Sequence, residues 1–180
     1  MRSVSLILAL ALFPLAAQHS TPSRAEVEAM EQAFDKKIRQ YSLDSPMEVL
    51  GLTRGLYLQG YGVVFTTELS VVQSPMLSPF RPPFTKEEIA KLKQTKLRRM
   101  PELKTLMRQM MVSSAGSIDR LPMEERVVLG VFLFYNNWED STGMPRRITM
   151  AAQRRALLDI AANHKPDSAM DQVIQVREED

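Results

Sequence analysis

The chain has 180 residues, a formal net charge of +2 and no cysteine. Without cysteine, disulfides, thiol catalysis, zinc–thiolate sites and a lipid-modified cysteine are all excluded. The near balance of charges gives no reason to expect nucleic acid or an acidic surface as a partner.

The first 17 residues have the layout of a secretory signal peptide. Arg2 precedes an apolar run from Val4 to Leu12, and the small residues Ala16 and Ala17 follow shortly after it. The run is shorter than the roughly 20 residues that span a bilayer. We expect cleavage near Ala17 and a periplasmic or secreted protein, and an uncleaved anchor is the alternative.

Residues 18–23 are expected to form a flexible leader and residues 24–180 a single domain. A domain of this length buries about 70% of the surface of its unfolded chain, so a core alone can hold it together. No second apolar stretch of membrane length occurs. The mature chain is therefore expected to have no transmembrane segment.

The first part of this domain predicts a helix and then a hairpin. Between Arg24 and Tyr41, apolar residues recur every three or four positions, and Ser23 with Glu26 has the spacing of a capping box. A hairpin is predicted at about 50–72, from strands at 49–59 and 63–72. The second strand alternates between an apolar and a mixed face, which is typical of a half-covered antiparallel strand.

A long basic helix is predicted next. A proline-rich connection over residues 74–83 ends at Thr85 and Glu88, a second capping box, and a helical apolar stripe then runs through residues 86–115. Pro101 lies in the middle of that stripe and disfavours helical geometry at Met100. One kinked helix and two consecutive helices fit equally well.

The remaining elements complete an α+β pattern. The run at 126–135 is apolar on both faces, which predicts a central strand that is covered on both sides or lies at an oligomer contact. A loop, a short strand at 147–150 and a helix at 151–163 follow. Residues 173–176 fit a helix or a strand, and their β-branched residues favour a last strand. We therefore expect a mainly antiparallel sheet with helices on one face.

Gly60 and Gly62 raise the question of a phosphate site. A dinucleotide-binding fingerprint requires a third glycine that opens a helix, whereas this chain has Phe65 there and a strand follows. No lysine with an adjacent serine or threonine stands in the Walker position. The two glycines instead predict a hairpin turn with positive φ that displays Tyr61 at its tip.

The loop NNWED (residues 136–140) is the main candidate for ligand binding. It joins the only tryptophan, Trp138, to the carboxylates of Glu139 and Asp140, but its spacing does not match a calcium loop. A polar loop with Trp138 as a lid on the core is the alternative. Glu68, the one charged residue in the second hairpin strand, and Tyr61 complete the candidate binding residues.

Other features indicate chemistry less directly. Residues 86–108 hold eight basic and three acidic residues, but lysines interrupt the apolar stripe, which favours a solvated helix over a membrane-surface helix. His164 follows a predicted helix and lacks a nucleophile motif around it. The thioethers of Met107, Met110 and Met111 have the spacing for Cu(I), although core packing is the commoner role of methionine.

Two stretches, GLYLQGYGVVFTTELSVV (residues 55–72) and ERVVLGVFLFYNNWEDSTGMPRRITM (residues 125–150), carry a resemblance. Together with the predicted signal peptide, they make the chain similar to uncharacterised exported bacterial proteins with a G-Y-G-x-x-F hairpin. The resemblance implies export and the hairpin, and it implies no activity.

No catalytic set of residues is complete, so three functions stay open. The first is a non-catalytic, exported cell-envelope protein that binds an envelope protein or a small ligand, without a cofactor and with a homodimer as one possible state. The second is a small periplasmic enzyme that uses Glu139 or Asp140. The third is a copper-binding protein that uses the methionines.

Overall fold

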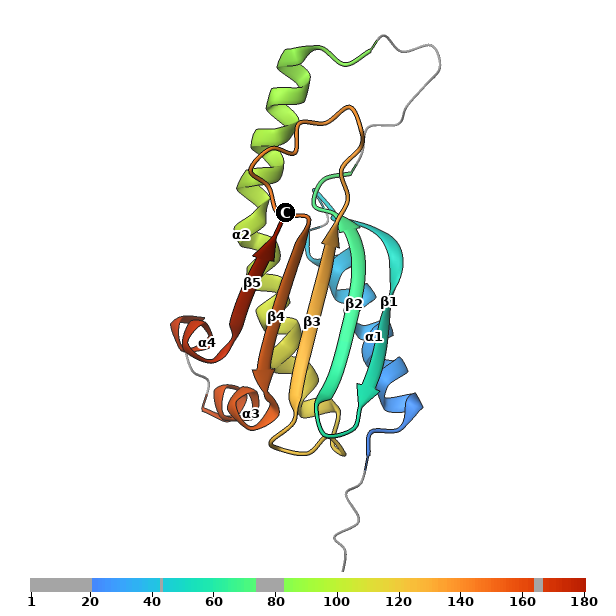
Figure 1. The fold of residues 1–180 in the computed structure, drawn as a ribbon, viewed down its shortest axis with the longest axis vertical. Coiled ribbons are helices and arrows are strands. Elements are labelled where there is room, and N and C mark those ends of the chain that lie inside the picture. Colours follow the sequence, from blue (N-terminus) through green and yellow to red (C-terminus); the bar gives the residue numbers. More distant parts are fainter. Residues whose placement is uncertain (1–20, 43, 74–82, 164–166) are drawn as a thin grey trace, which may run out of the picture.

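A computed structural model describes residues 21–42, 44–73, 83–163 and 167–180. The predicted signal peptide, the first residues of the leader, most of the proline-rich connection and His164 lie outside the described residues. The described part of the chain has an α+β fold, as expected, with helices packed on a five-stranded sheet (Figure 1).

The strands follow one another across the sheet in chain order, β1 to β5. The strands are β1 (Glu48–Leu58), β2 (Gly62–Ser70), β3 (Arg126–Leu133), β4 (Arg147–Gln153) and β5 (Gln175–Glu179). Neighbours are antiparallel except β2 and β3, which are parallel. A parallel pair needs a crossover, and α2 (Lys86–Ser117) supplies it.

The two long helices cover one face of the sheet (Figure 1). α1 (Arg24–Gln40) lies behind β1 and β2, and α2 extends behind the rest. Both helices begin with the predicted capping boxes. α3 (Arg154–Ala162) packs against α2, and α4 (Asp167–Val173) precedes β5. No helix among the described residues is both long and apolar enough to cross a membrane.

Several element boundaries differ from the sequence predictions. Of the two arrangements that fitted residues 86–115, the structure has the single helix: α2 continues through the exposed Pro101, because the buried side chains of Met100 and Leu103 hold it to the core on both sides of the proline. β3 ends at Leu133 instead of residue 135. Val173 belongs to α4, so the last strand begins two residues later than predicted.

The predicted helix at 151–163 begins only at Arg154, because its first three residues belong to β4. Ala151 and Ala152 pair with Val128 and Val127 of β3. Ladder pairing and burial against the central strand outweigh the intrinsic helix propensity of alanine.

The hydrophobic core lies between the helices and the covered face of the sheet. Phe34 of α1 meets Phe65 of β2 edge to face, with 4.9 Å between the ring centroids. Gly55 permits this close packing, since a Cβ there would lie 2.5 Å from Cγ1 of Val27. α2 contributes mainly leucine and methionine side chains: Leu103, Leu106, Met107, Met110 and Met111.

The outer edge of β1 is protected by acidic side chains of α1. The backbone N–H of Thr53 donates to Oδ1 of Asp35 (3.0 Å), and that of Gly55 donates to Oε1 of Glu31 (2.7 Å). β1 also has irregular register between Val49 and Arg54. Backbone N–H groups that already have an acceptor discourage another chain from pairing with an edge strand, and so do β-bulges.

Candidate binding face of the sheet

The sheet face opposite α1 and α2 is covered by no described helix (Figure 1). We call it the open face. Side chains that alternate with the core residues point to it, and the strand register places them in rows. One row crosses the sheet through Leu56, Val64, Val128, Ala151 and Gln175, and the next through Arg54, Thr66, Gly130, Thr149 and Arg177.

The open face has an apolar half and a polar half. On β1 and β3, Leu56 is 60% exposed and Phe132 is 43% exposed, although both are large hydrophobic side chains. β4 and β5 instead present Thr149, Gln175 and Arg177. β3 was expected to be covered on both sides or to lie at an oligomer contact, and within the described residues its outer side is uncovered at Phe132.

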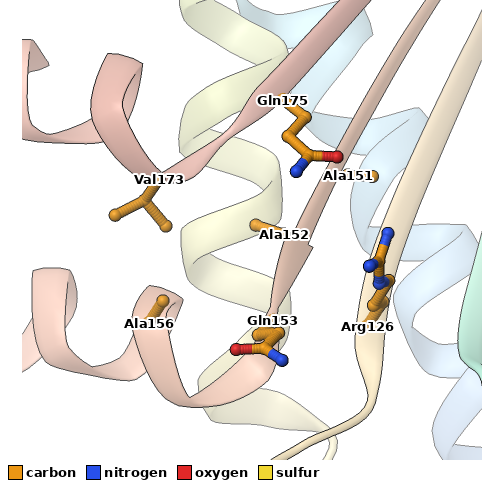
Figure 2. A pocket seen from close by; sticks show the side chains of 7 residues that line it. All are labelled: Arg126, Ala151, Ala152, Gln153, Ala156, Val173 and Gln175. Atoms are coloured by element: carbon orange, nitrogen blue, oxygen red, sulfur yellow. The ribbon is translucent and has the colours of Figure 1, made fainter.

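Two adjoining hollows lie at the polar half of the open face: the face hollow on the sheet itself, and the corner hollow where the ends of β4 and β5 meet α3 and α4. The corner hollow, of about 280 Å³, is shown in Figure 2 and is lined by Arg126, Ala151, Ala152, Gln153, Ala156, Val173 and Gln175. The face hollow, of about 300 Å³, is lined by Tyr61, Arg126, Val128, Thr149, Ala151, Gln175, Val176, Arg177 and Glu179. Arg126, Ala151 and Gln175 line both hollows, so the two hollows adjoin.

The chain builds these hollows from small side chains beneath a rim of polar ones. Ala151 on β4 and Ala156 on α3 leave the space open, whereas Arg126 and Gln175 stand beside it on β3 and β5 (Figure 2). Within the described part of the chain, neither Arg126 nor Arg177 forms an ion pair with a carboxylate. Two cationic groups are therefore available to a ligand.

The hairpin tip borders the face hollow. Gly60 and Gly62 have φ of 78° and 137°, which confirms that they serve the backbone turn. A Cβ on Gly62 would lie 2.0 Å from the carbonyl oxygen of Arg126, so only glycine fits there. The N–H of Arg126 donates to the carbonyl of Tyr61 (2.9 Å). Tyr61 is 45% exposed and lines the face hollow.

Glu125 holds the hairpin to the start of β3. Its Oε1 accepts hydrogen bonds from the N–H of Gly60 (3.0 Å) and from the hydroxyl of Tyr57 (3.1 Å). Burial, followed by the hydrogen bond and charge of Glu125, raises the pKa of Tyr57 above its ordinary value. Tyr61 and Arg126 are thus presented by a fixed backbone.

The NNWED loop lies at the other end of the sheet and docks on α2. Glu139 forms a nearly fully buried ion pair with Lys96, and Oε1 of Glu139 also accepts from the backbone N–H of Asn136 (3.1 Å). Trp138 stacks on Phe84, with 4.0 Å between the ring centroids. The loop is therefore attached by charge and by aromatic packing. Trp138 also lines a hollow of about 330 Å³ together with Phe84 and Leu92.

Asp140 and Tyr135 complete this attachment. The hydrogen bond from Lys93 (2.7 Å), followed by bonds from Thr142, lowers the pKa of Asp140 to about 2. Burial, followed by the charge of Glu139, raises the pKa of Tyr135 to about 12. Its hydroxyl donates to the carbonyl of Pro145 (2.9 Å). A carboxyl group with a pKa of about 2 has lost its proton near neutral pH and is a weak general base.

The predicted site residues do not converge. Tyr61 lies at the hairpin end, whereas Trp138, Glu139 and Asp140 lie near α2 at the opposite end. Glu68 lies on the open face, where it pairs with Phe132 across the strands. The side chains of Met107, Met110 and Met111 are at most 1% exposed and pack in the core.

Carboxylates elsewhere in the chain neutralise much of the basic helix α2. Lys93, Lys96 and Arg99 interrupt its apolar stripe because each reaches a polar partner: Asp140, Glu139 and Ser45, respectively. Further along, Lys104 pairs with Glu178, and Arg108 pairs with Asp171. The run of basic residues thus fixes the loop and the C-terminal segment to the helix.

Sequence reasoning missed Arg126, Gln175 and Arg177. The one available signal was a cation at the first position of an apolar strand, since Arg126 precedes VVLGVFL. Gln175 and Arg177 gain their place only when β5 pairs with β4. Among the described residues, no group of three or more histidine, aspartate and glutamate residues is arranged to hold a metal ion.

No family model matches the chain, and the searches for similar curated proteins and for similar solved structures found no match.

Proposed function

We propose that the chain is an exported, non-catalytic cell-envelope protein that binds a small organic anion in the corner and face hollows. The observation that carries this proposal is the pair of adjoining hollows, one on the open face and one between the end of the sheet and the helices α3 and α4, bordered by Arg126 and Arg177. Export is inferred from the N-terminal sequence, and binding from the polar half of the open face.

The lining indicates the kind of ligand. Arginine forms strong, charge-assisted hydrogen bonds with carboxylate and phosphate groups. The amides of Gln153 and Gln175 add neutral donors and acceptors at the rim, whereas Ala156 and Val173 form an apolar wall. A ligand with one anionic group and a short apolar body fits both parts. The volumes of about 280 Å³ and 300 Å³ suit a small metabolite.

Calorimetric titration of the purified chain with acetate, hexanoate and inorganic phosphate tests the proposal. Hexanoate should bind at least about tenfold more tightly than acetate, because each buried methylene contributes about 0.8 kcal/mol and only some of the added methylenes need be buried. Phosphate binding as tight as hexanoate binding would assign the site to phosphate groups. Failure of all three to bind at millimolar concentration would contradict the proposal.

Matched variants locate the site. Arg126→Gln should weaken hexanoate binding about tenfold or more, since a hydrogen bond to a charged group contributes about 1.5–3 kcal/mol. Arg98→Gln removes an exposed arginine of α2 that lines neither hollow and should leave binding unchanged. Export has its own test: N-terminal sequencing of the chain recovered from the periplasm should begin near Gln18.

A further inference from the structure

We infer, building on the proposed function, that the bound anion is a dicarboxylate whose two carboxylates are held by Arg126 and Arg177. Both arginines line the face hollow, and within the described residues neither has a carboxylate partner. A ligand with a single anionic group pairs with only one of these two cations. A second anionic group at the other end of the ligand pairs with both.

The strand register places the two arginines at opposite corners of the face hollow. Arg126 pairs with Gln153 of β4, and Arg177 pairs with Thr149, which lies four residues from Gln153 on the same strand. Paired residues, and residues an even number apart on one strand, share a face of the sheet, so both arginines point to the open face. Since β4 separates β3 from β5, the two Cα atoms lie roughly 16 Å apart, from a strand spacing of about 4.8 Å and a rise of about 3.3 Å per residue.

This separation suits a diacid of moderate length. An extended six-carbon diacid spans five carbon–carbon bonds, roughly 6 Å, and hydrogen bonds of about 2.9 Å at both ends let it join two nitrogen atoms roughly 13 Å apart. Each arginine therefore needs to lean inward by only a small part of its length. In Figure 2 the guanidinium group of Arg126 extends from the start of β3 towards Ala151, which is the direction of the face hollow.

The residues between the two arginines fit the middle of such a ligand. Val128 and Ala151 lie on the line from Arg126 to Arg177 and line the face hollow, and Val128 is only 6% exposed. Methylene groups gain free energy when they leave water for apolar side chains of this kind. The apolar middle of a diacid can thus lie over Val128 and Ala151 while its charged ends stay at the arginines.

One carboxylate of the chain also lines the face hollow, but it has a cation of its own. Glu179 forms an ion pair with Arg147, so its charge is already balanced. The hollow therefore keeps two unbalanced positive charges, those of Arg126 and Arg177. A dianion matches this surplus, and carboxylates match the planar donor pattern of the guanidinium group.

Calorimetric titration of the purified chain with adipate and with hexanoate tests this assignment at low ionic strength. The two probes have the same number of carbons and differ only in the second carboxylate. Adipate should bind about fivefold more tightly or better, because an exposed ion pair contributes up to about this factor and partial burial by the ligand adds to it. If hexanoate binds and adipate binds no more tightly, the dicarboxylate is wrong and the proposed function stands. Failure of both probes contradicts the proposed function itself.

Two variants show where the second carboxylate binds. Arg177→Gln should bring the adipate and hexanoate affinities to within about twofold of each other, since one arginine then remains for either ligand. Arg54→Gln is the matched control, because Arg54 lies in the same row of the open face but on β1, at the far edge of the sheet, and lines neither hollow. It removes the same charge and should leave the preference for adipate unchanged. Equal effects of the two variants on this preference would overturn the inference, because the second carboxylate would then not be bound at Arg177.

Discussion

The hairpin tip and the NNWED loop lie at opposite ends of the sheet and use their polar residues in opposite ways. At the hairpin end, backbone contacts fix Tyr61 and Arg126, and their side chains border a hollow. At the loop end, the carboxylates of Glu139 and Asp140 are joined to lysines of α2. The cluster of charged residues in the NNWED loop thus holds the structure together, whereas the single arginine at the start of β3, Arg126, borders a hollow.

The difference follows from how each end of the sheet is attached to the rest of the fold. The loop leaves the sheet after β3 and is attached to α2 by side chains, so its charges are used internally. The hairpin is a tight turn whose backbone packs directly on β3. Its side chains are therefore not needed for attachment, and they remain available at the surface.

The largest expected effect concerns the backbone contact at the hairpin end. Gly62→Ala places a methyl group against the backbone of Arg126 and should lower the free energy of unfolding by about 4 kcal/mol or more, since both strands must shift. Urea denaturation followed by circular dichroism measures this loss.

Gly60→Ala is the matched control for that variant. Its φ is also positive, but a Cβ there meets nothing within 4 Å. It should cost only about 1–2 kcal/mol, the usual cost of left-handed backbone in a residue with a side chain. Equal losses for the two variants would show that positive φ, not the contact with β3, makes Gly62 necessary.

The next largest effect is expected when the ion pair that attaches the NNWED loop to α2 is broken. Lys96→Met should lower the free energy of unfolding by about 3 kcal/mol, because it leaves the buried carboxylate of Glu139 without its cation. Lys96→Met combined with Glu139→Gln should recover part of this loss, since no buried charge then remains unpaired. Fluorescence of Trp138, the only tryptophan, reports on the loop during urea denaturation. No loss in the single variant would contradict a structural role of the pair.

Local patterns in the sequence predicted much of the fold. The spacing of apolar residues gave α1, the turn glycines gave the hairpin, and the cap residues gave the starts of both long helices. These features depend on neighbours in the chain. The parallel pairing of β2 with β3 was missed because it arises only when α2 returns across the sheet.

The candidate site was harder to predict for the same reason. Arg126 lies on β3, whereas Gln175 and Arg177 lie on β5, about 50 residues later in the chain and on the other side of β4. No local spacing in the sequence links them. The polar loop was the more visible pattern. The signal for its structural role was present in the basic helix, where Lys96 occupies a position of the apolar stripe and therefore requires a buried partner.

The smallest expected effect tests the exposed ion pair at the loop end. In a carboxyl-detected NMR titration, Asp140 should titrate with a pKa of about 2. Lys93→Met should raise this pKa towards its ordinary value without reaching it, because the N–H of Thr142 still donates to Oδ1 (3.0 Å). Lys91→Met, a nearby exposed lysine of the same helix, should leave it unchanged.

The sign of the stability effect of Asp140 follows from its lowered pKa. The folded chain binds this proton less readily than the unfolded chain, so the stabilisation is present above about pH 4 and is lost as the pH falls towards 2. Solvent screens this exposed pair, which keeps its contribution small compared with that of the buried pair. Thermal melts at pH 7 should therefore separate Lys93→Met from the unmodified chain far less than they separate Lys96→Met. A comparable loss in both variants would mean that burial is not what distinguishes the two lysines.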